Sequence, residues 1–124
     1  MLDRADRLHR RFFIHSASPG SPLSSPNWEP PLDIVETGGE LRVDLALPGV
    51  RADSITLTGD ADGLTVAATR AFPSRDPQAR IQRIEIPYGR FERRLALDLE
   101  RLELAHQAYA DGVLTLTFRR KEGA

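Results

Sequence analysis

The sequence predicts an all-β fold, either a sandwich or a barrel, on three observations. Beyond residue 27, apolar side chains recur at every second position in several short runs, as in strands that bury one face. Between the runs stand turn-forming clusters of Gly, Pro and Asp. No long stretch of this region has the apolar period of a helix. The length of 124 residues suits a single domain.

The alternation identifies the strands one by one. Leu114, Leu116 and Phe118, for example, alternate with threonines, so one face of that strand is apolar and the other polar. In the run from Phe91 to Leu97, Arg93 interrupts an otherwise apolar face. The predicted strands contain residues 41–47, 55–58, 64–67, 84–86, 91–97 and 114–118.

The breaks between these runs have specific turn chemistry. Pro48-Gly49 suits the centre of a type II turn, and residues 60–63 read as a hairpin connection. Asp111-Gly112 is typical of a two-residue hairpin with positive φ angles. Residues 70–80 hold two Pro and three Arg with little alternation, so a long loop is expected there.

The first 26 residues differ from the rest. Within residues 1–15, Leu2, Ala5, Leu8 and Phe12 fall on one side of a short amphipathic helix, which is marginal in water unless it docks. It reads equally well as a frayed terminus or as a docking segment for a subunit or client, and less well as a membrane-surface helix. Residues 16–26 contain five Ser and three Pro and read as a mobile linker. The predicted division is arm and linker 1–26, sandwich 27–121 and vestigial tail 122–124.

Composition argues against several functions. The net charge is −1 and no basic strip alternates with aromatics, so nucleic acid is not an expected partner. No apolar run is long enough for a membrane span. The chain has no Cys, and residues 1–11 lack the apolar centre of a signal peptide, so a cytoplasmic location is expected.

Motifs for catalysis are also missing, and no enzyme activity or cofactor is expected. Lys121 is the only Lys and stands outside any phosphate-binding Gly-Lys-Ser/Thr motif. The histidines are too scattered for a zinc site and read as surface residues; they are His9, His15 and His106. The carboxylate pairs Asp60/Asp62 and Glu100/Glu103 are interpreted as turn and connector residues.

Four local motifs, in order, resemble the α-crystallin domain of the small heat-shock protein family. Residues 31–36 look like its opening strand, and Leu45 to Val50 contains its Leu-Pro-Gly-Val turn. Residues 85–93 are similar to its Tyr-Gly-x-Phe-x-Arg segment, and residues 108–116 to its Ala-x-Tyr-x-Asn/Asp-Gly-Val-Leu signature. The resemblance covers about residues 28–121. It implies an immunoglobulin-like antiparallel β-sandwich with a short flexible N-terminal arm.

The resemblance also implies a function. Small heat-shock proteins bind unfolding clients without ATP and prevent their aggregation under stress. By analogy, the client-binding residues expected here come from the arm and from a groove between the sheets; they are Leu8, Phe12, Phe13, Ile14, Ile55, Leu57 and Tyr109. The alternative is a co-chaperone-like sandwich that docks on one folded partner.

A homodimer is expected, built by exchange of a strand around residues 81–86, with small higher oligomers as its further assembly. The predicted interface residues are Ile81, Ile84, Ile86, Arg93 and Arg94. The sequence departs from the family in two ways. Residues 118–121 replace the usual Leu-Pro-Lys, and no Ile-x-Ile motif follows Lys121. We therefore expect dimers to join only weakly, through their arms.

Overall fold

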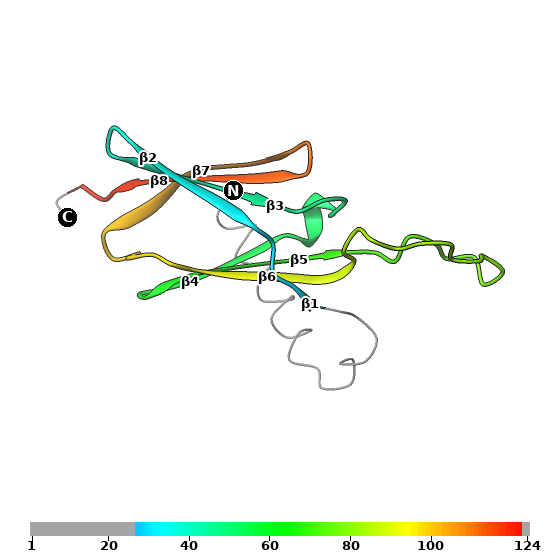
Figure 1. Cartoon of the computed structure of the whole chain (residues 1–124). Helices are drawn as coiled ribbons and strands as arrows, with labels where there is room; N and C mark the ends of the chain where they lie inside the picture. The colour runs from blue at the N-terminus through cyan, green and yellow to red at the C-terminus, as the bar shows by residue number, and fades with distance from the viewer. Residues whose placement is uncertain (1–26, 123–124) are drawn as a thin grey trace.

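The computed structural model describes residues 27–122 and contains two four-stranded sheets packed face to face (Figure 1). One sheet has the strand order β1-β6-β5-β4 and the other β2-β3-β8-β7. The strands are β1 Asn27–Trp28, β2 Leu32–Thr37, β3 Glu40–Ala46, β4 Thr56–Asp60, β5 Gly63–Arg70, β6 Gly89–Ala96, β7 Leu102–Ala110 and β8 Val113–Arg120. A 3-10 turn, η1 (Ala52–Ser54), precedes β4. The predicted β-sandwich is confirmed.

The core lies between the two sheets and is formed by the alternating apolar positions. The largest fully buried side chains include Phe91 of β6 and Phe118 of β8. Arg93, which breaks the alternation, is half-buried between Phe91 and Leu95. Trp28 packs edge-on against Phe91 with ring centroids 4.9 Å apart, and so attaches β1 to β6. This β1–β6 contact is parallel, whereas the other strand pairs are antiparallel.

The three predicted turns are confirmed. Asp111 and Gly112 have φ angles of 54° and 77° and join β7 to β8 as a two-residue hairpin. Gly49 has a φ of 71°, and Val50 N donates to Leu47 O at 3.4 Å, as a type II turn requires. Asp60 ends β4, and its carboxylate accepts a hydrogen bond from Asp62 N at 2.9 Å in the turn to β5.

The strand predicted at residues 84–86 does not form within the single chain, and its pairing with a partner stays a prediction. Residues 81–86 form no strand; they belong to an extension, residues 71–88, that leaves the end of β5 and returns at β6. Figure 1 shows this extension projecting well beyond the two sheets. A strand is stable only when it pairs with another strand, and no strand of the described chain runs beside residues 81–86. The long loop expected at 70–80 is therefore longer than predicted.

Candidate functional site

The edge strand β2 is the most accessible part of the sandwich. It pairs with β3 on one side, and its other side has no neighbour among residues 27–122. Five of its six residues are exposed, including Ile34 at 50% and Val35 at 48%. Unpaired backbone beside exposed apolar side chains is the usual setting for the addition of another strand. The neighbouring charges are acidic, from Asp33 and Glu36.

The extension presents a second exposed apolar set. Ile81 and Ile86 are 48% and 55% exposed, and Ile84 is partly covered. The central part of the extension is basic, with Arg80 and Arg83 both exposed. Three of the predicted interface residues therefore lie on one projecting segment, accessible to another molecule. Their role in a dimer stays a prediction.

Two of the predicted groove residues, Ile55 just before β4 and Leu57 within it, are buried. Ile55 and Leu57 are only 6% and 4% exposed and belong to the core between the sheets. Tyr109 of β7 is half-buried, and its hydroxyl donates to Leu47 O at 2.6 Å. Ile55 and Leu57 therefore present little surface to a client in this structure. Client binding by these three residues stays a prediction.

Gln107 is a residue that sequence reasoning missed. It lies two residues before Tyr109 on β7, an edge strand, and is itself half-buried. Its side-chain oxygen Oε1 is buried and accepts no hydrogen bond from any described residue. A buried acceptor without a donor is costly, so a donor from another segment or molecule would be favoured there. A single Gln in a sequence carries no sign of this.

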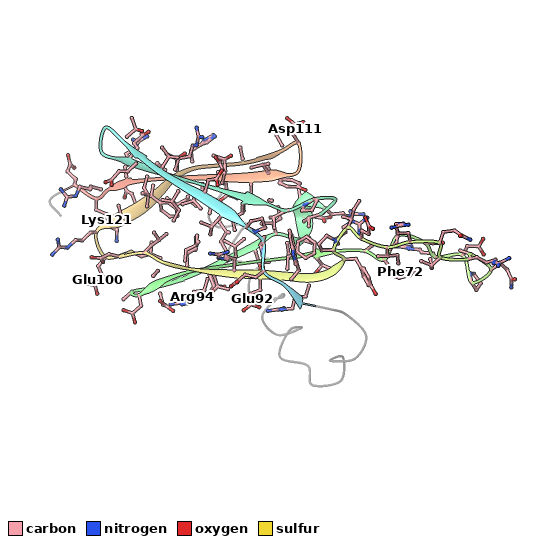
Figure 2. The ribbon with its side chains drawn as sticks, viewed as in Figure 1. Phe72, Glu92, Arg94, Glu100, Asp111 and Lys121 are labelled. Atoms are coloured by element: carbon pink, nitrogen blue, oxygen red, sulfur yellow. The ribbon has the colours of Figure 1, made fainter. Side chains whose placement is uncertain are left out.

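Arg93 and Arg94 point to opposite sides of β6. Arg93 Nη1 donates to Pro30 O at 3.1 Å, near the start of β2. Arg94 lies on the outer side, where Figure 2 shows it near Glu92, and pairs with the carboxylate of Asp60 at 3.0 Å. Both guanidinium groups are thus engaged within the chain. A contribution to a dimer interface stays a prediction for both.

Among residues 27–122, the ionisable groups with shifted pKa values, Arg51 and Asp60, lie exposed at the surface. Hydrogen bonds from Arg94 and from Asp62 N lower the pKa of Asp60, which is exposed at the end of β4. A shallow acidic hollow of about 420 Å³ lies between this turn and the β6–β7 connector, lined by Ala61, Asp62, Ala96, Leu97, Asp98 and Glu100. Residues 27–122 contain no group of three His, Cys, Asp or Glu placed to hold a metal ion.

The remaining predicted client-binding residues lie outside the described residues; they are Leu8, Phe12, Phe13 and Ile14. The arm helix and the linker predicted for residues 1–26 lie there too. Between residues 27 and 122, the structure has no helix with the length and apolar character needed to cross a membrane.

Comparison with known proteins identifies the class. The model of the Hsp20/alpha crystallin family matches residues 33–124. The chain belongs to this family, the small heat-shock proteins, as the four sequence motifs indicated.

Several proteins are similar over most of the chain. The 18 kDa antigen 2 of Mycobacterium avium is 38% identical over 98 residues, which cover 76% of this chain and 67% of that protein. The 18 kDa antigen 1 of the same organism is 37% identical, over 69% of this chain and 58% of the relative. Small heat shock protein C4 of Rickettsia felis is 28% identical over 94% of this chain and 74% of its own length. The match thus spans about three fifths to three quarters of these relatives.

Solved structures give the same fold. HspA of Xanthomonas axonopodis superimposes with a TM-score of 0.66 and 29% identity, over 78% of this chain and 98% of that chain. A small heat-shock protein of Xylella fastidiosa, described as having a distinct high order structure, gives 0.66 and 26%, over 78% and 90%.

Proposed function

We propose that this protein is an ATP-independent chaperone that binds unfolding proteins under stress and prevents their aggregation. The observation that carries the proposal is the open edge of β2, where Ile34 and Val35 are about half exposed beside unpaired backbone. Unfolding proteins expose apolar side chains and unsatisfied peptide groups, and an open strand edge can receive both. Family membership supports the same function.

Client capture is proposed to use the arm as well as the sandwich. Phe12, Phe13 and Ile14 form an apolar cluster beyond a Ser/Pro-rich linker, which suits contact with many different surfaces. On the sandwich, the edges of β4 and β7 would admit an extended client segment beside Tyr109. The donors of that segment could satisfy the buried oxygen of Gln107.

We also propose a homodimer formed by strand exchange. The extension of one protomer would pair with the β2 edge of the other, so that Ile84 and Ile86 meet Ile34. Basic Arg80 and Arg83 would then lie near acidic β2. Pairing would give hydrogen-bond partners to the unpaired backbone of β2 and of the extension. It would also cover the exposed apolar side chains of both segments. Its further assembly into small oligomers, and its cytoplasmic location, stay predictions.

The decisive experiment measures light scattering while several unrelated proteins are heated with and without the chaperone. A general chaperone lowers the scattering of most of them at near-stoichiometric amounts, equally with and without ATP. Protection of none, with tight binding to one folded protein, would favour the co-chaperone-like module instead. Saturable ATP hydrolysis by the pure protein would contradict the ATP-independent mechanism.

A further inference from the structure

Two of the sequence motifs meet at one end of the sandwich, where the extension begins. Leu47 N donates to Gly112 O at 2.8 Å, so the Pro48-Gly49 turn lies against the β7–β8 hairpin turn. A Cβ placed on Gly112 would stand 3.7 Å from Pro48 Cα, in ordinary contact. Figure 2 shows Asp111 and Phe72 toward this end, and Glu100 and Lys121 toward the other. The root of the extension therefore adjoins this hydrogen-bonded pair of turns.

Arg70 connects this pair of turns to the extension. It is the last residue of β5 and pairs with Gly89, the first residue of β6, so it stands where the chain leaves the sandwich and returns. Its Nη1 donates to Ile86 O at 3.3 Å and to Pro87 O at 3.1 Å. One half-buried guanidinium thus holds the two peptide carbonyls that end the returning segment.

Gly49 leaves the space that the Arg70 side chain occupies. A Cβ on Gly49 would lie 2.7 Å from Arg70 Nε, closer than real Cβ contacts allow, and 3.0 Å from Cδ, which is tight. Gly49 also has a φ of 71°, which favours glycine for a separate reason. Gly39 has a similar φ of 84° but nothing within 4 Å of its missing Cβ. Substitution of either glycine strains the backbone, but only substitution of Gly49 would also displace Arg70. Comparison of the two substitutions therefore separates these effects.

An aromatic pair joins the two ends of the extension close to the sandwich. Contacts farther along the extension join residues that are close in sequence. Phe72 packs edge-on against Tyr88 with centroids 5.1 Å apart, joining the outgoing and returning chains. Within the extension, Asp76 N donates to Ser74 Oγ and Arg83 pairs with Glu85. These contacts join residues that are close in sequence and do not attach the extension to the sandwich.

We propose that Arg70 is a positioning residue: seated over Gly49 and bonded to the carbonyls of Ile86 and Pro87, it fixes the direction in which the extension projects. The proposal deepens the strand-exchange dimer and rests on it for its consequence, because an extension held in place loses less conformational entropy on pairing with a second copy. The fixed direction itself does not depend on the dimer.

The test measures the extension's direction with two spin labels. The chain has no Cys, so Gln78→Cys near the far end and Ala108→Cys on exposed β7 can be labelled selectively. Labelled protein is mixed with excess unlabelled protein, so that only distances within one chain are seen. We expect a narrow distance distribution in the otherwise unchanged protein, and broad distributions for Arg70→Met and Gly49→Ala. Gly39→Ala is the matched control and should stay narrow.

A narrow distribution in monomeric Arg70→Met would overturn the proposal. Equal distance distributions for Gly49→Ala and Gly39→Ala would contradict the proposal that Gly49 leaves room for the Arg70 side chain. Melting temperatures confirm that each variant is folded.

The consequence for assembly is read separately by sedimentation. Loss of preorganisation should raise the dimer dissociation constant of Arg70→Met by about tenfold. A broadened extension with an unchanged dissociation constant would overturn this consequence and leave the positioning role intact. A protein that is monomeric without any substitution would instead contradict the strand-exchange dimer, while the spin-label result would still decide the role of Arg70.

Discussion

The hydroxyl of Tyr109 donates a 2.6 Å hydrogen bond to the backbone carbonyl of Leu47, joining edge strand β7 to the chain just after β3. Leu47 is almost fully buried, so this carbonyl has little access to water. The bond links two sequence motifs that stand 62 residues apart. It gives Tyr109 a structural role beside any contact with clients.

Tyr109→Phe removes this hydroxyl and should lower the free energy of unfolding by about 1 kcal/mol. The loss stays moderate because Leu47 O also accepts a weaker bond from Val50 N. Urea denaturation of both proteins measures the difference. His106→Ala, at an exposed position of the same strand, is the control and should change stability by less than about 0.5 kcal/mol. Equal stability of Tyr109→Phe and the parent protein would show that the bond contributes nothing.

The pair Asp60–Arg94 makes a small part of the stability depend on pH. Arg94 lowers the pKa of Asp60 in the folded state, so the unfolded chain takes up the proton first as the pH falls. The stabilisation is complete above the unfolded value of about 4 and is lost as the pH drops through the lower folded pKa. Asp60→Asn should therefore be less stable than the parent at pH 7, and the difference should shrink by pH 3.

Urea denaturation at several pH values measures this effect. The control is Arg94→Met, in which the main cause of the shift is gone, so adding Asp60→Asn should then change the pH profile little. A difference between Asp60→Asn and the parent that is constant from pH 7 to pH 3 would contradict the assignment. Because both groups are exposed, only the direction is predicted.

The sequence pattern predicted the sandwich well because the information was local. The alternation of Leu114, Leu116 and Phe118 defines a buried face, and all three are core residues. Asp111-Gly112 prescribes its turn through backbone conformation alone. Such features need no knowledge of the rest of the chain.

The extension and the site could not be predicted in the same way. Ile84 and Ile86 alternate just as Ile55 and Leu57 do, yet the first pair lies on a projecting segment and the second in the core. Alternation shows what a strand would look like but not whether a neighbour exists to pair with it. The contact of Arg70 with Gly49 joins residues that only the fold brings together.

The arm is predicted to raise the capacity for clients. In the chain of 124 residues, Phe12→Ser with Phe13→Ser removes two aromatics, each able to contribute about 2 kcal/mol when buried against a client. The amount of chaperone needed for half-maximal protection should rise several-fold, whereas deletion of residues 1–26 should raise it further. Light scattering of a heated client measures both. His9→Ser with His15→Ser, in the same segment, is the control. Full protection after the deletion would show that the arm is dispensable.

The exposed isoleucines of the extension should be required for the dimer. Ile84→Asp combined with Ile86→Asp places two carboxylates where the proposed partner edge already carries Asp33 and Glu36, so burial and charge both oppose pairing. The sandwich itself should stay folded, because neither isoleucine belongs to its core. Sedimentation at micromolar concentration should therefore show a monomer with an unchanged circular dichroism spectrum.

Val113→Asp provides the matched control for that double variant, since it introduces a carboxylate at another exposed apolar position, at the start of β8. It should remain dimeric. A double variant that is still dimeric would contradict strand exchange and point to pairing through β6, whose neighbour β1 is only two residues long and leaves much of that edge open. A monomer in both the double variant and the control would show that added negative charge alone dissociates the protein. Only the combination of a monomeric double variant and a dimeric control supports the extension as the segment that joins two chains.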